Sequence, residues 1–329
     1  MKKLINSVET LLDESLRGFA LAHADIVRFS PDPRYLARLA SREPGKVALI
    51  SGGGSGHEPL HSGCVGLGML DAACPGQVFT SPTPDQMLAA AMDMENGGGI
   101  LFVVKNYAGD MMNFEIASEM LDFPNASLLV HDDVSIPEHQ GMGRRGVAGT
   151  TIVEKIVGAA AEAGLGLDDC KALGERVVRA TASMGVALTS CTVPALGKPT
   201  FDIAENEIEL GVGIHGEKGR ERVGLLNASE IVERLAQTID EELKPAKGQP
   251  VLLHVNGFGA TPLIELYLVY NLARQYWDSR GVVVTRSLVG NFTTSLDMAG
   301  ASITLTLLDD ELTRHWDAPV HTAALRWGC

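Results

Sequence analysis

Glycine-rich segments of this sequence carry the side chains best suited to chemistry. Residues 51–59 read Ser-Gly-Gly-Gly-Ser-Gly-His-Glu-Pro, so His57 follows four glycines that lie within five residues. Glycines let the backbone turn sharply and approach a ligand closely. The apolar run at 47–50 predicts a buried strand, and α/β proteins bind ligands beyond the carboxyl ends of their strands. We therefore expect a ligand-binding loop at the glycine segment, residues 52–56.

Lys105 and Asp110 follow a second apolar run, residues 100–104. If both strands are parallel, this pair lies at the same sheet edge as the glycine segment. A carboxylate beside an ammonium group in a polar loop suits a general base or a hydroxyl clamp. A salt bridge within a loop is the alternative that these two residues leave open.

His215 lies in the segment Gly-Val-Gly-Ile-His-Gly-Glu, residues 211–217, after a stretch of alternating polar and apolar residues. A loop histidine is commonly structural or solvated, so its type alone does not make it catalytic. Asp132 and Asp133 at a strand end suit either Mg²⁺ or a solvated turn. The pair Arg144–Arg145 suits either an anionic ligand or an ordinary surface.

His57 to His61 matches the zinc motif H-E-x-x-H letter for letter. That motif binds zinc only when both histidines project from one face of a regular helix. Pro59 fits best at the first position of a helix, so His57 would lie before it. We expect no metal site, and a zinc hydrolase is kept as the alternative from a different class. The segment is neither a Walker A loop nor a G-x-G-x-x-G turn, and fits a generic backbone nest.

Composition narrows the classes of function. The chain has 329 residues, a net charge of −14 and 45% hydrophobic residues. Its acidity disfavours nucleic acid as a partner, and no apolar run is long enough to cross a membrane. The five cysteines are scattered without metal-ligand spacing, and the first residues lack the apolar region of a secretory signal. We expect a cytoplasmic protein with reduced thiols.

Strand and helix patterns alternate along the chain, which predicts an α/β fold. We expect two α/β domains, each a sheet flanked by helices, with a mainly parallel sheet in the N-terminal domain. The predicted domains are residues 1–184, with the glycine segment and Asp110, and residues 185–329, with His215. Pro59 is expected to start a helix, and residues 167–187 are expected to be largely helical. The site is expected where the two domains meet.

Eight motifs occur in a fixed order along the chain, and their combination is more specific than any one of them. Together they resemble the substrate-binding (K) subunits of dihydroxyacetone kinases. The resemblance is strongest to the type that depends on the phosphotransferase system. The resemblance covers essentially the whole chain. The motifs are Gly-Gly-Gly-Ser-Gly-His-Glu-Pro (52–59), Phe-Thr-Ser-Pro-Thr-Pro-Asp (79–85), Lys-Asn-Tyr-Ala-Gly-Asp (105–110), Gly-Arg-Arg-Gly-Val-Ala (143–148), residues 211–217, Gly-Ala-Thr-Pro-Leu (259–263), Thr-Ser-Leu-Asp-Met (294–298) and Trp-Asp-Ala-Pro-Val-His-Thr (316–322).

The resemblance implies a role for each matching residue. His215 would attack the ketone of dihydroxyacetone (glycerone) and form a hemiaminal. Asp110 would bind the terminal hydroxyl and act as its base, with His57 assisting. The remaining substrate contacts would be Gly54, Ser55, Gly56 and Lys105. A covalent bond to the carbonyl rejects glycerol, which has none, and holds the substrate still for phosphoryl transfer.

The resemblance also implies partners. The family forms homodimers and takes its phosphoryl group from ADP/ATP with Mg²⁺, on a separate nucleotide-binding (L) subunit or on a domain fused to the same chain. No nucleotide motif is recognisable here, so we expect no cofactor on this chain and an L subunit as partner. The donor, phosphoenolpyruvate or ATP, is left open. A sensor that signals to a transcription regulator and a kinase subunit for erythrulose are the alternatives, and glycerol metabolism is the expected context.

Overall fold

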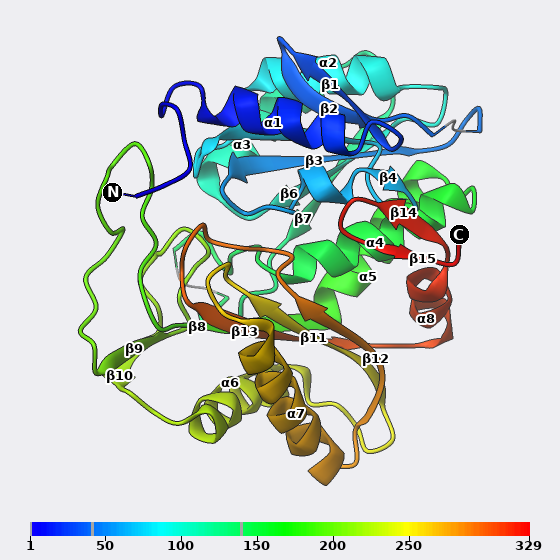
Figure 1. Cartoon of the computed structure of the whole chain (residues 1–329). Coiled ribbons are helices and arrows are strands. Elements are labelled where there is room, and N and C mark those ends of the chain that lie inside the picture. The colour runs from blue at the N-terminus through cyan, green and yellow to red at the C-terminus, as the bar shows by residue number, and fades with distance from the viewer. Residues whose placement is uncertain (1, 41–42, 139–140) are drawn as a thin grey trace. The chain divides into compact units, whose positions relative to one another are not determined.

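The computed structural model describes residues 2–40, 43–138 and 141–329 (Figure 1). The chain divides into two compact units, which are described separately. Unit 1 consists of Met1–Val130, Thr151–Arg176 and Arg314–Cys329, and unit 2 of His131–Thr150 and Val177–Thr313. The predicted α/β class with two sheets flanked by helices is confirmed.

The units do not coincide with the predicted division between residues 184 and 185. The division of the structure falls within three helices, α4 (Gly149–Glu162), α5 (Leu167–Arg179) and α8 (Asp310–Asp317). Residues 151–176 belong with unit 1 because they bind its other segments. The carboxylate of Glu162 pairs with Arg38, and Lys155 donates to the carbonyl of His315 at 2.8 Å.

Unit 1 is built on a six-stranded sheet in the order β1-β2-β5-β3-β6-β7. Strands β5, β3, β6 and β7 are mutually parallel, and β1 and β2 add an antiparallel hairpin at one edge, so the predicted mainly parallel sheet is confirmed. The strands are β1 (Val27–Pro31), β2 (Arg34–Arg38), β3 (Ala48–Ser55), β5 (Ala72–Val78), β6 (Ile100–Lys105) and β7 (Asn125–Val130).

Strands β3 and β6 are buried along their whole length, as continuous apolar runs in a parallel sheet require. Side chains from the sheet and the helices beside it form one apolar core that includes Ile50, Phe102 and Phe114. The remaining elements of this part of the chain are α1 (Leu11–Ala22), the 3₁₀ helix η1 (Ser62–Cys64), β4 (Gly66–Leu67), α2 (Pro84–Met94), α3 (Ala108–Glu119), β14 (Val320–Thr322) and β15 (Arg326–Trp327).

Unit 2 is built on a second six-stranded sheet in the order β10-β9-β8-β13-β11-β12. Only β11 and β12 are parallel neighbours; the other pairs are antiparallel. Helices α6 and α7 pack on this sheet around a core that contains Trp277. The elements are β8 (Thr181–Ala187), β9 (Glu207–Leu210), β10 (Glu221–Gly224), α6 (Ala228–Leu243), β11 (Pro250–Gly257), α7 (Leu263–Ser279), β12 (Val283–Gly290) and β13 (Gly300–Leu307).

One predicted helix is too long, and another is absent. Helix α5 ends at Arg179, and residues 181–187 form strand β8, which pairs with β13 along its length and is buried throughout. Cross-strand pairing and burial decide this segment against its local pattern. Pro59 starts no α-helix: the chain turns there and forms only η1. Among the described residues, no helix is both long and apolar enough to span a membrane.

Asp71, directly before β5, contacts the end of β2, the segment just before β3 and the start of β3, the strand that contains the glycine segment. Its fully buried carboxylate accepts from Arg38 Nη1 at 3.1 Å, from Lys46 Nζ at 2.7 Å and from the backbone N–H of Leu49 in β3 at 2.8 Å. Two buried cations and a strand N–H thus share this carboxylate, and Glu162 is a second, partly exposed partner of both cations.

We expect Asp71→Ala to destabilise the protein by about 3 kcal/mol or more, because removing one partner of a buried ion pair leaves uncompensated charge. Chemical unfolding measures the change. Asp13→Ala is the matched control: Asp13 also pairs with an arginine, Arg34, but its side chain is 48% exposed, so its loss costs less than about 1 kcal/mol. Equal effects of the two substitutions would contradict the assignment.

Candidate active site

The glycines at 52–54 form the carboxyl end of strand β3 rather than a loop after it. A methyl group on Gly53 would lie 2.3 Å from Lys105 Nζ, and one on Gly54 would lie 2.5 Å from the backbone nitrogen of Thr80. Glycine is therefore needed at Gly53 so that a lysine side chain from the neighbouring strand can lie against the backbone.

Lys105 is the last residue of β6, and its ammonium group is buried. Nζ donates to the carbonyl of Gly52 at 3.3 Å and lies 3.5 Å from Asp110 Oδ2. Asp110 is in the first turn of α3, where the helix dipole favours a negative charge. Lys105 and Asp110 are 1% and 3% exposed, so their attraction is little screened by water. The two residues thus form a salt bridge, which is the alternative that the sequence left open, and this salt bridge is buried.

His57 follows β3 and is held by an aromatic ring. Its imidazole stacks on Phe79, with ring centroids 5.0 Å apart and planes 15° apart, and it is 1% exposed. Phe79 has a positive φ of 56°, which is unusual for a bulky residue. Its backbone N–H donates to the carbonyl of Ser55 at 2.9 Å, which fixes the ring beside the glycine segment. Sequence reasoning gave Phe79 no role, because the positive φ that aims its ring is not readable from residue type.

Ser55 and Gly56, which are predicted substrate contacts, form hydrogen bonds with nearby groups of the protein. The Ser55 hydroxyl donates to the carbonyl of Gly76 at 2.7 Å, so its oxygen is left to accept from a ligand. Gly56 has a φ of 104°, and its N–H donates to both oxygens of the Glu58 carboxylate, at 3.1 and 2.9 Å.

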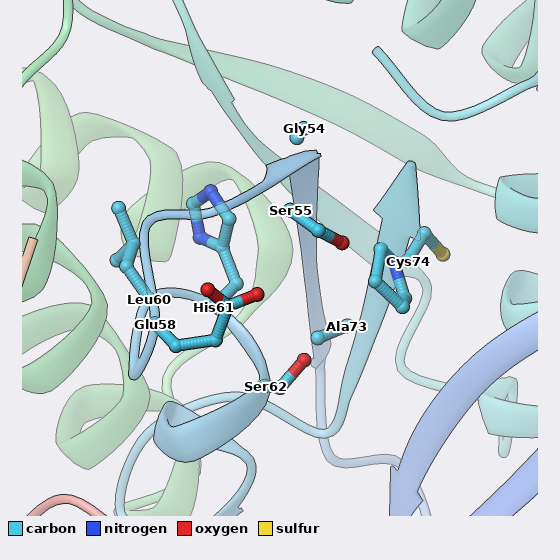
Figure 2. Close-up of a pocket in the computed structure, with 10 residues that line it drawn as sticks. Gly54, Ser55, Glu58, Leu60, His61, Ser62, Ala73 and Cys74 are labelled. Atoms are coloured by element: carbon cyan, nitrogen blue, oxygen red, sulfur yellow. The ribbon is translucent and has the colours of Figure 1, made fainter. Parts of the chain in front are cut away.

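A small cavity adjoins the glycine segment. Ser55, Glu58, His61 and Ser62 contribute to its lining, together with residues of β5 (Figure 2). Its volume of about 10 Å³ is near the least that holds one water molecule. This cavity is therefore too small for a three-carbon ketose.

Unit 2 holds His215, which its own loop orients. His215 Nδ1 lies 2.7 Å from Glu217 Oε1, and its backbone N–H donates to Glu217 Oε2 at 2.9 Å. Burial alone would raise the pKa of Glu217, but the hydrogen bond and charge of His215, with the charge of Arg145, lower it to about 2. An ionised Glu217 accepts from Nδ1–H, so the neutral imidazole carries its lone pair on Nε2.

The glycines of this loop make room for that contact. A methyl group on Gly213 would lie 2.1 Å from Glu217 Oε2, and one on Gly216 would lie 2.5 Å from Thr200 Oγ1. A side chain at either position would displace these groups, including the Glu217 carboxylate that contacts His215. Sequence reasoning quoted Glu217 in the motif but gave it no role; its position two residues after His215 was the signal available.

Other charged residues singled out in the sequence have structural partners. Asp132 accepts from the N–H groups of Val147 and Gly149, at 2.8 and 2.7 Å. Asp133 is 2.7 Å from Arg145 Nη2, and Arg144 is 2.6 Å from a carboxylate oxygen of Glu242.

The zinc motif lacks the geometry of a zinc site. Residues 57–61 are not helical. Nδ1 of His61 lies 2.6 Å from Glu154 Oε1, and Nε2 lies 2.7 Å from Lys105 Nζ, so both ring nitrogens have protein partners. Within the described residues, no group of three or more His, Cys, Asp or Glu side chains is arranged to hold a metal ion.

Comparison with known proteins places the chain in a family. The model of the Dak1 domain matches residues 17–324. The chain belongs to the Dak1 family. It is 46% identical, over the whole length of both chains, to the dihydroxyacetone-binding subunit DhaK of the PEP-dependent dihydroxyacetone kinase of Escherichia coli. The predicted membership of the dihydroxyacetone kinase substrate-binding subunits is confirmed.

Solved structures with the same fold include an enzyme and a co-activator. The chain superposes on a dihydroxyacetone kinase operon co-activator, DhaQ, with a TM-score of 0.88 and 33% identity, covering 94% of this chain and 96% of that one. It also superposes on the dihydroxyacetone kinase of C. freundii in complex with AMP-PNP and Mg²⁺, with a TM-score of 0.87 and 32% identity; that match covers 98% of this chain and 60% of the longer one.

The Glu217 carboxylate gives a pH-dependent contribution to stability. Because folding lowers its pKa from 4.5 to about 2, the stabilisation is complete above the unfolded value and is lost as the pH falls toward 2. We expect Glu217→Gln to flatten the loss of stability between about pH 5 and pH 2, as measured by unfolding at a series of pH values. Glu205→Gln, at an exposed position, is the control and should show the same dependence of stability on pH as the unmodified chain. A steep loss of stability between about pH 5 and pH 2 in Glu217→Gln would contradict the assignment.

Proposed function

We propose that this chain is the dihydroxyacetone-binding subunit of a dihydroxyacetone kinase and holds its substrate covalently on His215. The observation that carries the proposal is the pairing of His215 with ionised Glu217, which directs the imidazole lone pair to Nε2. The whole-length similarity to the E. coli dihydroxyacetone-binding subunit supports the substrate.

The covalent step follows from this pairing. Nε2 attacks the carbonyl carbon, a C–N bond forms, and the π electrons of the carbonyl pass to its oxygen, which takes a proton from solvent. The imidazole nitrogen Nδ1 passes its own proton to the Glu217 carboxylate or to water, which leaves a neutral hemiaminal. The side chain of His215 is 22% exposed, so a small ketone can reach it from solvent.

The phosphoryl transfer step uses the residues of unit 1. Asp110 accepts the proton of the terminal hydroxyl as its oxygen attacks phosphorus, and the stacked His57 assists at the same hydroxyl. The proposal assigns the carbonyl of the substrate to His215 and its terminal hydroxyl to Asp110. Gly54, Ser55, Gly56 and Lys105 are the further proposed contacts. A ketose with one more carbon, such as erythrulose, presents the same carbonyl and hydroxyl.

A partner supplies the phosphoryl group in this proposal. The E. coli relative belongs to a PEP-dependent kinase, which favours the phosphotransferase-system type for this chain. The C. freundii structure holds a nucleotide analogue and Mg²⁺ on a chain of which this one covers 60%, in keeping with the fused arrangement in the family. The nucleotide and Mg²⁺ would thus sit on an L subunit. A homodimer and a cytoplasmic location remain predictions.

A second function, ketose sensing, is favoured by the fold match to the co-activator. A sensor needs the covalent step on His215 but not proton transfer from the hydroxyl. The buried Lys105–Asp110 pair and the stacked His57 supply that proton transfer, which favours the kinase. Binding without turnover in the presence of an L subunit and either phosphoryl donor would favour the sensor.

We expect intact-mass measurement after incubation with dihydroxyacetone to show a gain equal to one whole substrate molecule, because addition to the carbonyl releases no water. His215→Ala should abolish the adduct, and glycerol should give none. His23→Ala, at the end of helix α1, is the matched control and should keep it. An adduct that survives in His215→Ala would refute the role of His215.

We expect Asp110→Asn to keep the adduct and to lower the rate of dihydroxyacetone phosphate formation by about 10²–10⁴-fold, the usual contribution of a general base. The rate is measured with an L subunit and a phosphoryl donor, and the adduct by mass on the same preparation. Full turnover in Asp110→Asn would show that another group takes the hydroxyl proton.

A further inference from the structure

A buried chain of polar side chains runs inward from Asp110. Lys105 Nζ lies 3.5 Å from Asp110 Oδ2 on one side and 2.7 Å from His61 Nε2 on the other. His61 Nδ1 then lies 2.6 Å from Glu154 Oε1, on helix α4. All four residues belong to unit 1 and each is at most 6% exposed. The proposed reaction uses Asp110 and Lys105, and gives no role to His61 or Glu154.

The two ring contacts of His61 fix how protons are shared. Burial, followed by the charges of Lys105 and His57, holds the pKa of His61 well below its ordinary value, so the ring is neutral and carries one proton. If Lys105 is an ammonium that donates to Nε2, the ring proton is on Nδ1 and Glu154 must accept it as a carboxylate. If Glu154 is protonated and donates to Nδ1, the ring proton is on Nε2 and Lys105 must accept it as a neutral amine.

Ser51 favours the first arrangement. Its hydroxyl donates to the carbonyl of Val103 at 2.7 Å, so at 3.0 Å from His61 Nδ1 its oxygen can only accept. Burial favours the second: it raises the pKa of Glu154 to about 8, and Oε2 of that residue has no hydrogen-bond partner among the described residues. The two preferences oppose each other, so the charge on Asp110 can decide between the arrangements.

We propose that His61 and Glu154 are positioning residues that form a proton relay, through which Lys105 gives up its proton when Asp110 gains one from the substrate. One proton passes from Lys105 Nζ to His61 Nε2, and another passes from His61 Nδ1 to Glu154 Oε1. Lys105 becomes a neutral amine, Glu154 a neutral acid, and the imidazole changes only its tautomer. This inference rests on the proposed function for the source of the first proton.

Electrostatics gives the relay its direction. While Asp110 is ionised, its charge holds the proton on Lys105, and the ammonium in turn stabilises the carboxylate. Once Asp110 is neutral, Lys105 and Glu154 are left as a buried charge pair separated by a whole imidazole ring, which is costly in a medium of low dielectric constant. Proton transfer along the relay removes both charges.

Asp110→Asn tests the relay without substrate, because asparagine resembles the neutral acid. In protein labelled with ¹⁵N-histidine, the nitrogen chemical shifts measured by NMR distinguish the two imidazole tautomers. The signals of His61 are identified as those that are missing from the spectrum of His61→Gln. We expect Nδ1–H in the unmodified protein and Nε2–H in Asp110→Asn. The double variant Asp110→Asn/Glu154→Gln lacks the final acceptor and should not make the change. Asp110→Ala removes the same charge if the asparagine variant fails to fold.

The same tautomer in the unmodified protein and in the folded Asp110 variants would overturn the proposal. Glu162→Gln, on the same helix but paired with Arg38 and Lys46, is the matched control and should leave the His61 signals unchanged.

A kinetic test uses the complete kinase. We expect Glu154→Gln to lower kcat by about tenfold or more with little change in KM, since acid–base effects of this size are usual. Glu154→Asp, which keeps a proton acceptor, should recover part of the rate. An unchanged kcat in Glu154→Gln would count against the relay. Absence of turnover in the unmodified protein would instead refute the proposed function, while the tautomer measurement still decides the relay.

Discussion

The arrangement of unit 1 depends on the burial of one ammonium group, that of Lys105. A buried cation is unfavourable unless charged or polar partners surround it. Here the carbonyl of Gly52, the imidazole of His61 and the carboxylate of Asp110 provide them. The side chain reaches these partners only because position 53 lacks a Cβ atom. The glycine segment thus makes room for the side chain of Lys105, in addition to its proposed contact with a ligand.

The elements that could be predicted from the sequence are those whose pattern is local. The runs at 47–50 and 100–104 became the buried strands β3 and β6, because continuous apolar residues suit a parallel sheet covered on both faces. Strand β8 was misread as helix, because its small residues are held by pairing with β13, far along the chain. Strand β5 contains Cys74-Pro75-Gly76, a local signal for a turn that parallel pairing with β3 overrides.

Only part of the candidate site could be predicted from local patterns in the sequence. Lys105 ends a strand, His57 and Asp110 follow strands, and topology alone brings strand ends in a parallel sheet together. The residues that orient them were not found, because their roles arise from distant contacts. Glu154 meets His61 across 93 positions of the sequence. His61 received no role from the sequence, because its zinc-motif spacing to His57 has meaning only on a helix and a metal site was not expected there.

The environments of His215 and Asp110 differ in the way that the proposed chemistry of each requires. A nucleophile must be reachable, and the ring of His215 is partly exposed beside a carboxylate whose pKa is about 2. A proton acceptor gains from exclusion of water, and Asp110 and its partners are almost wholly buried. Because the proposed nucleophile and the proposed base belong to different units, a different part of the chain sets the surroundings of each.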